Sequence, residues 1–211
     1  MPCRHIFCRN KLFCLKKMKM MRCHKYISPA LAAALFYLVC AGCTSQNLEK
    51  TYATLEENID KYITTNFSDS SLYTIHRNAG SNRITVNPSD SSGFEMPSDT
   101  LMAGGNVVFD YAMYIFGNSF PPTNMIAATT QELADQGGLW GDSTVFQPVS
   151  VNLSDRHLLE GLRNGLLGVY AGEECYIIFS PEYGFGNDEV NAIPKMSSLM
   201  YHIWIHSIEN R

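Results

Sequence analysis

Residues 158–208 read LLEGLRNGLLGVYAGEECYIIFSPEYGFGNDEVNAIPKMSSLMYHIWIHSI. The residue types in this stretch predict a helix, a glycine turn, an apolar strand, an aromatic loop and a final strand, in that order. We expect the helix over about 156–167, where Leu158, Leu162 and Leu166 recur every four residues on one face. A helix with one wide apolar stripe buries that stripe against a sheet.

The residues around this helix extend the pattern. Ser154 or Asp155 is expected to cap its N-terminus, because each offers a side-chain acceptor to the free N–H groups of the first turn. Residues 175–179 form a continuous apolar run and predict a strand. The final strand alternates between two faces. One face carries Leu199, Tyr201, Ile203 and Ile205, and the other carries Met200, His202, Trp204 and His206.

Shorter segments upstream suggest the rest of the fold. Strands are expected at residues 72–76, 83–86 and 146–153, and a glycine turn followed by a strand is expected over 104–111. Residues 116–141 resemble a long insertion, and the apolar spacing of residues 47–64 predicts a helix that is either packed on the fold or a stalk for dimerisation. Together they predict an α+β fold, an antiparallel β half-barrel wrapped on one short helix, with an N-terminal helix.

Charge is divided unevenly along the chain. Residues 1–43 hold eight Lys or Arg and no acidic residue, whereas residues 44–211 hold eight basic and twenty acidic residues. The second part therefore carries a net charge of −12, against −4 for the whole chain. A surface of this sign repels phosphate backbones, so no nucleic-acid partner is expected.

The seven cysteines offer no disulfide framework for the folded part. Six lie at or before Cys43, and Cys175 alone lies in the body of the chain, so the fold must rest on its apolar core. The early cysteines are spaced more widely than zinc ligands. His202 and His206 share one face of a strand about 13 Å apart, too far for one metal. Neither a metal nor a cofactor is expected.

The first 43 residues have the features of an export signal. A basic stretch at 16–25 precedes an apolar run at 30–39, and Cys40-Ala41-Gly42-Cys43 follows. The Ala-Gly-Cys ending resembles the lipobox of bacterial lipoproteins, which implies a lipid on Cys43 and a place in the bacterial cell envelope, at the periplasmic side or the outer membrane. Plain cleavage and a retained anchor helix are the alternatives. The expected division is a signal at 1–43, a helical segment and linker at 44–80, and the folded domain at 81–211.

The order of elements in residues 158–208 resembles the C-terminal half of the FKBP-type prolyl isomerases. Residues 104–111, a glycine turn leading into a strand that ends at Tyr111, resemble an earlier segment of the same family. The resemblance implies an FKBP-like half-barrel with an apolar cleft between the helix and the aromatic loop, which holds a proline ring. It also implies a peptidyl-prolyl cis-trans isomerase (rotamase) that acts on proline-containing polypeptides without a cofactor.

The same resemblance assigns particular residues to the substrate cleft. Tyr111 corresponds to its aromatic wall, Leu158 and Leu159 to the aliphatic pair whose backbone contacts the ligand, and Ile193 to an aliphatic loop residue. Tyr183 is expected to pack the base of the loop instead. The complete candidate set is Tyr111, Val149, Leu158, Leu159, Leu162, Phe185, Ile193 and Tyr201.

Four positions differ from the family pattern. Leu162 stands where a tryptophan usually floors the cleft, and Phe185 stands where a tyrosine usually offers a hydroxyl. Val149 replaces a common phenylalanine, and Ala128 aligns with the usual aspartate. These differences predict a low turnover. Two functions therefore stay open: an exported, membrane-anchored isomerase that assists protein folding, and a weakly active or inactive FKBP-like module that binds proteins as a chaperone.

Overall fold

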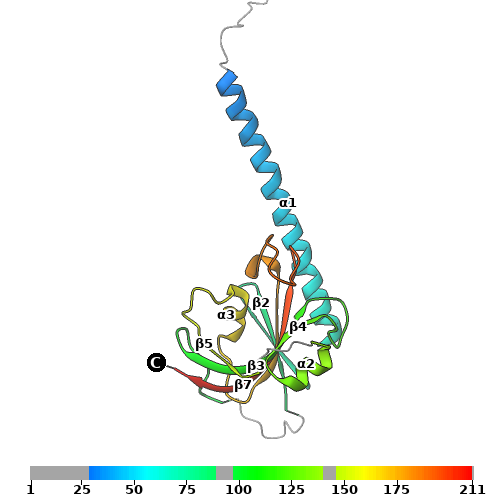
Figure 1. Ribbon diagram of the computed structural model, residues 1–211, viewed down its shortest axis with the longest axis vertical. Helices are drawn as coiled ribbons and strands as arrows, with labels where there is room; N and C mark the ends of the chain where they lie inside the picture. The colour runs from blue at the N-terminus through cyan, green and yellow to red at the C-terminus, as the bar shows by residue number, and fades with distance from the viewer. Residues whose placement is uncertain (1–28, 89–96, 140–145, 211) are drawn as a thin grey trace, which may run out of the picture. The chain divides into compact units, whose positions relative to one another are not determined.

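The computed structural model describes residues 29–88, 97–139 and 146–210, and their side chains from residue 47 onward. The chain divides into two compact units, Met1–Thr44 and Ser45–Arg211. Every described strand belongs to the second unit (Figure 1), and helix α1 (Pro29–Asn66) crosses the border between the units. Among the described residues, no helix has both the length and the hydrophobicity of a membrane span. The basic stretch at 16–25 lies outside the described residues.

A single antiparallel sheet organises the second unit. Its described strands are β1 (Tyr73–Asn78), β2 (Ser81–Val86), β3 (Asn106–Ile115), β4 (Met125–Ala128), β5 (Val149–Asn152), β6 (Glu174–Phe179) and β7 (Leu199–Glu209). Their order is β1-β2-β6-β7-β3-β4, and β5 also pairs with β3. Every pairing is antiparallel. The α+β class and the antiparallel sheet expected from the sequence are confirmed.

The two longest strands, β3 and β7, form the centre of the sheet. They pair from Asn106 opposite Glu209 to Ile115 opposite Leu199, with one irregularity between Val108 and Phe109. The alternation predicted for β7 is confirmed, because its residues divide between two apolar clusters on opposite faces of the sheet. We call the face of Tyr201 the inner face and that of Trp204 the outer face.

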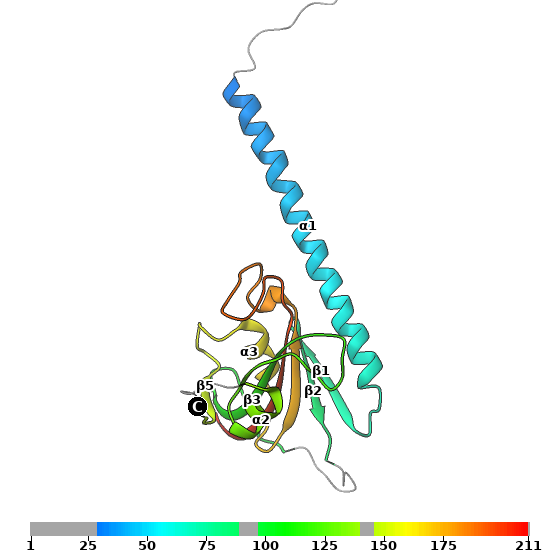
Figure 2. The ribbon, with the colours of Figure 1, turned by 45° about the vertical axis from the view of Figure 1, so that its right-hand side comes forward.

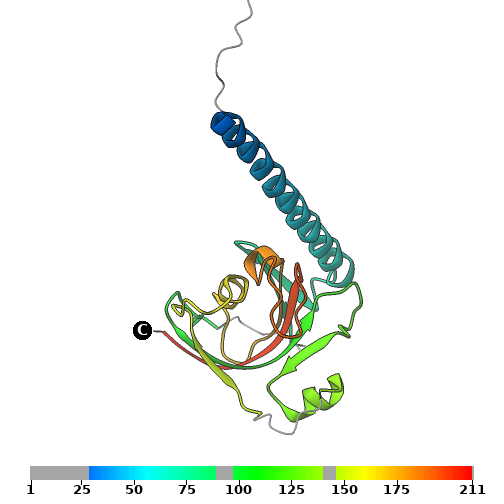
Figure 3. The same ribbon diagram turned by 45° about the horizontal axis from the view of Figure 1, so that its top comes forward.

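Helix α3 (Glu160–Leu166) covers the inner face, and the curved sheet wraps around it (Figure 3). Leu162 and Leu166 are buried there, as predicted. The helix lies close to β6 because Gly161 has no side chain: a Cβ at this position would lie 2.2 Å from Cγ of Phe179. Alanine at this position would therefore push the helix away from the strand.

The predicted start and cap of α3 were wrong. The helix begins at Glu160, and its N-cap, Leu159, makes no side-chain hydrogen bond. Asp155 instead accepts a hydrogen bond from the backbone N–H of His157 at 2.9 Å, inside a turn. Leu158 and Leu159 pack against the inner cluster from this non-helical segment. The three leucines spaced four residues apart therefore pack on one apolar surface, although only Leu162 and Leu166 lie in the helix.

The C-terminal turns of α1 cover the outer face. Ile59, Ile63 and Phe67 are at most 1% exposed, and they pack with residues of β2, β6 and β7. The packed reading of the predicted helix is thus confirmed for its last turns, and its bounds extend beyond 47–64. β1 and β2 form a hairpin whose turn contains Ala79 and Gly80 (Figure 2), so the strands on either side of this turn belong to the same sheet.

The region 116–141 contains regular structure that the sequence did not reveal. Strand β4 pairs with β3, and α2 (Gln131–Gly137) follows it. Thr130 caps α2, since its hydroxyl accepts a hydrogen bond from the N–H of Leu133 at 3.3 Å. The last two residues of this region, 140 and 141, lie outside the described residues.

Candidate functional site

Most of the predicted cleft residues meet on the inner face, beside α3. Leu162, Ile193 and Tyr201 are buried members of the inner cluster, each 6% exposed. The half-buried members are Tyr111, Leu158, Leu159 and Phe185. Together these seven residues form what we call the candidate proline site. Val149 lies opposite Phe109 on β5, half-buried and outside that cluster.

Two tyrosines form the aromatic side of this site. The ring centroids of Tyr111 and Tyr201 are 5.5 Å apart, and the ring of Phe179 stacks on that of Tyr201 at 6.0 Å. Burial raises the pKa of both phenols, and the charge of Tyr111 raises that of Tyr201 further. Both hydroxyls are therefore neutral at physiological pH. Tyr201 and Tyr111 can exchange hydrogen bonds with a ligand without presenting a charge.

The loop after β6 is held by its own backbone. The N–H of Gly186 donates to the carbonyl of Pro181 at 2.8 Å, and the N–H of Met196 donates to the carbonyl of Gly186 at 3.0 Å. Val190 and Ile193 pair as an isolated antiparallel bridge. These bonds fix the positions of Phe185 and Ile193 relative to the inner face. The loop is therefore organised before any ligand arrives.

Tyr183 packs the base of this loop, as predicted. A Cβ on Gly80 would lie 1.9 Å from the Tyr183 ring, so the ring fills the space above the β1–β2 turn. Gly80 also has a φ of 78°, a left-handed conformation that favours glycine. Tyr183 therefore links the loop to the first hairpin, and it also packs against the inner cluster.

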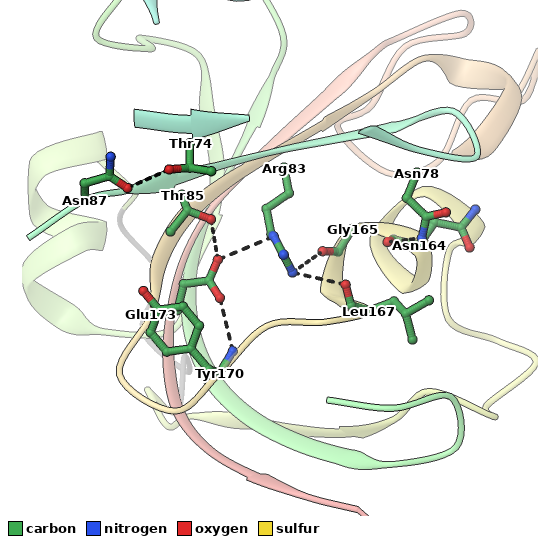
Figure 4. A network of polar contacts seen from close by, with 10 residues as sticks. All are labelled: Thr74, Asn78, Arg83, Thr85, Asn87, Asn164, Gly165, Leu167, Tyr170 and Glu173. Atoms are coloured by element: carbon green, nitrogen blue, oxygen red, sulfur yellow. Dashed lines mark hydrogen bonds and ion pairs between the residues drawn. The ribbon is translucent and has the colours of Figure 1, made fainter. Parts of the chain in front are cut away.

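A buried ion pair fastens the end of α3 to the sheet (Figure 4). Nε of Arg83 lies 3.4 Å from Oε1 of Glu173, and the two side chains are 7% and 0% exposed. The guanidinium also donates to the carbonyls of Gly165 and Leu167, at 3.5 Å and 3.1 Å. A cation at a helix C-terminus is stabilised by the free carbonyl groups there. Arg83 therefore positions the helix that carries Leu162.

Glu173 is fully bonded on its other side. Its Oε1 accepts the hydroxyl hydrogen of Thr85 at 2.6 Å, and its Oε2 accepts the N–H of Tyr170 at 3.1 Å (Figure 4). Sequence reasoning missed this pair. The sequence offered one signal for it: a charged residue, Arg83, in a predicted strand, and another, Glu173, directly after a glycine turn.

The two strand histidines are bound to carboxylates on the outer face. Nε2 of His202 lies 2.8 Å from Glu174, and Nε2 of His206 lies 2.7 Å from Asp110. Asp110 also accepts a hydrogen bond from Thr129 at 2.7 Å, so it points away from Tyr111 as expected for neighbours on a strand. Across the described residues, no three His, Cys, Asp or Glu side chains are grouped to hold a metal ion.

The candidate proline site contains no side chain that is charged at neutral pH. Its lining is aliphatic and aromatic, and its polar atoms are two neutral phenols and the loop backbone. Such a surface suits an apolar ring and offers no strong acid or base. Cavities of about 240 to 480 Å³ lie elsewhere on the unit, and none of the seven residues lines them.

Comparison with known proteins agrees with the resemblance seen in the sequence. Residues 131–206 match the family model of the FKBP-type peptidyl-prolyl cis-trans isomerases. A short-type peptidyl-prolyl cis-trans isomerase of Methanocaldococcus jannaschii is 26% identical over 98 residues. That match covers 45% of this chain and 59% of the relative.

A comparison with solved structures gives matches of low sequence identity. The match to FkpA from Escherichia coli covers 85% of this chain and 71% of the FkpA chain, at 15% identity and a TM-score of 0.46. The N-terminal domain of FKBP42 from Arabidopsis thaliana covers 65% of this chain and 93% of its own, at 14% identity and a TM-score of 0.46. The FKBP domains of wheat FKBP73 cover 64% and 50%, at 16% identity and a TM-score of 0.47.

Proposed function

We propose, from the match of residues 131–206 to the FKBP-type peptidyl-prolyl cis-trans isomerase family model, that the protein catalyses the isomerisation of X–Pro bonds in polypeptides. The observation that carries the proposal is the grouping of seven apolar and aromatic residues, with no ionised side chain, between α3 and the loop after β6. We propose that a proline ring covers Leu158, Leu159 and Phe185.

The chemistry asked of this surface is modest. The peptide C–N barrier is roughly 18–20 kcal/mol, because the bond has partial double-bond character. Twisting the bond removes this resonance and with it the charge separation of the planar amide. An apolar surface favours the twisted state relative to water, and backbone donors of the ordered loop hold the substrate carbonyls. Uncatalysed isomerisation takes tens of seconds or more, slow enough to delay folding.

We expect the turnover to be low. The buried floor of the site is Leu162, and Phe185 has no hydroxyl to offer a substrate carbonyl. Fewer donors mean fewer interactions that strengthen in the transition state. The same two residues support the second candidate, a module that binds proline-containing chains without catalysis. Both functions use the same surface, and they differ in whether the bound X–Pro bond rotates faster.

A protease-coupled assay with a proline tetrapeptide distinguishes the two. The full chain, kept in solution with a mild detergent, is expected to raise the rate of cis-to-trans conversion above the uncatalysed rate. The same preparation is checked for folding by circular dichroism. A rate equal to the uncatalysed one, from a folded chain, would reject the isomerase and leave the binding module.

We also propose that the protein is exported and anchored in a bacterial cell envelope through a lipid on Cys43. The support is in the sequence: basic residues 16–25, the apolar run 30–39 and Ala41-Gly42-Cys43. Palmitate labelling of a bacterial host that expresses the chain tests this. Wild type should incorporate label and Cys43→Ser should not, whereas labelling of Cys43→Ser or none of wild type would exclude the anchor.

A further inference from the structure

The outer face of the sheet carries two adjoining cavities that are lined by no residue of the candidate proline site. One has a volume of about 480 Å³ and the other about 470 Å³. Leu133, Gln136 and Trp204 line both, so the two cavities adjoin, and together we call them the outer groove. Helix α2 and strand β7 both contribute lining residues. Trp204 lies on the opposite face from Tyr201 of the candidate proline site.

Aromatic rings that are already in position line the groove. The ring of His202 stacks on that of Tyr176 at 4.1 Å, and it lies 4.0 Å from the ring of Trp204 at a tilt of 40°. The bond from His202 to Glu174, at 2.8 Å, holds the central ring. Tyr114, Pro121 and Pro122 continue the lining. Rings held this way lose little conformational entropy when a ligand binds.

Two carboxylates line the groove. Among the described residues, neither cavity is lined by a lysine or an arginine, whereas Asp110 and Glu132 line the first cavity. Asp110 is bonded to His206 and Thr129. Glu132 is exposed, and no hydrogen bond or ion pair joins it to another described residue. An unpaired carboxylate that lines the same cavity as a tryptophan suits a cation, because the face of an indole ring is also electronegative.

We propose that the outer groove binds an extended polypeptide segment through an arginine or lysine side chain, which lies over Trp204 and meets Glu132. This inference rests on the proposed function, whose substrates are polypeptides. The groove then provides a second contact for a client chain, on the face opposite the candidate proline site. A client chain held there stays near the candidate proline site between successive isomerisation events. Engagement of both sites by one chain therefore binds it more tightly than either site alone. The cationic preference separates this occupant from a neutral oligosaccharide, which aromatic rings also bind.

Two fluorescently labelled peptides of twelve residues test the proposal by anisotropy on the full chain in mild detergent. Both lack proline, so neither depends on the candidate proline site; one carries three arginines and the other carries glutamine at those positions. The arginine peptide is expected to bind more tightly. Glu132→Gln should weaken its binding about threefold, and Trp204→Leu about fivefold. Glu57→Gln, which removes an exposed carboxylate from α1 outside both cavities, should leave it unchanged.

Three results would overturn the proposal. The first is equal affinity for the two peptides. The second is the same loss of binding in Glu57→Gln as in Glu132→Gln. The third is saturable binding of a neutral tetrasaccharide that Trp204→Leu abolishes while neither peptide binds, which would assign the groove to sugars. Isomerisation of a proline tetrapeptide is measured on the same preparations. Its failure alone would reject the proposed catalysis, and the peptide affinities still decide the groove.

Discussion

Phe185 is the residue whose removal probes the candidate proline site with least damage to the fold. It is half-buried in a loop that backbone hydrogen bonds hold in place, so its side chain contributes little to the position of the loop. Phe185→Ala is expected to lower the isomerisation rate severalfold, because about 1 kcal/mol of apolar contact with the proline ring is lost. The melting temperature should stay close to that of wild type.

Met102→Ala is the matched control for this change. Met102 is 64% exposed and lies outside the inner cluster, so its removal should alter neither rate nor melting temperature. Unfolding of Phe185→Ala would show that this side chain belongs to the core. An unchanged rate in a folded Phe185→Ala would remove it from the site.

The pair of Glu174 and His202 predicts a pH dependence of stability. The hydrogen bond from His202 lowers the pKa of Glu174 below its ordinary value of 4.5, and burial opposes this shift only in part. A lowered folded-state pKa stabilises the fold above pH 4.5 and loses this effect as pH falls through the folded value. Glu174→Gln should therefore reduce the free energy of unfolding at pH 6, and reduce it less at pH 3. Urea titrations at both values measure this, and an equal loss at both would refute the linkage.

At the scale of elements, α3 depends on Arg83 more than on its own sequence. The helix has seven residues and no side-chain cap, while Arg83 binds carbonyls at its C-terminal end. Helices this short are marginal without tertiary contacts. Arg83→Met should reduce the free energy of unfolding by about 3–5 kcal/mol, because it leaves the carboxylate of Glu173 buried without a cation. Denaturant unfolding measures this loss.

A second substitution separates the charge from the packing. Arg83→Met with Glu173→Met removes both charges and should recover part of the lost stability. Leu167, whose carbonyl the guanidinium contacts, keeps its backbone group in both variants. If the double variant were no more stable than the single one, the stranded carboxylate would not be the cause.

The elements predicted best were those whose pattern and burial agree. Strand β7 alternates strictly in sequence, and in the structure its residues alternate between two apolar clusters. The start of α3 was predicted about one turn too early, at about residue 156, because Leu158 and Leu159 continue the apolar pattern of the helix. They are apolar because they pack on the inner cluster, and they lie before the helix begins. The ion pair of Arg83 and Glu173 joins residues 90 positions apart in the sequence, and no local pattern announces such a contact.

At the scale of the whole second unit, the sheet is covered on both faces. α3 packs on the inner face, and α1 covers the outer face with Ile59, Ile63 and Phe67. The sequence predicted the first layer, since its apolar stripe is wide. It did not decide the second layer, because an amphipathic helix has the same apolar pattern whether it packs on its own sheet or on a partner. Seven of the eight residues that the sequence assigned to the candidate site pack together in or against the inner cluster, whereas Val149 lies outside it.

Ile63→Ala tests the structural role of α1. Ile63 is fully buried in the outer cluster, so its truncation should reduce the free energy of unfolding by about 2–5 kcal/mol. Lys61→Ala, two positions away on the exposed side of the same helix, should change it little. Chemical denaturation of the two variants provides the comparison. Equal, small effects would show that the helix is a detachable stalk.

The most direct test of the central claim is an isotope-filtered NOE measurement between a proline-containing peptide and the labelled full chain. The account predicts contacts from the proline ring protons to the aromatic protons of Tyr111 and Phe185 and to the methyl groups of Leu158. Contacts from the proline ring to Trp204 in the outer groove, with none to those three residues, would contradict it.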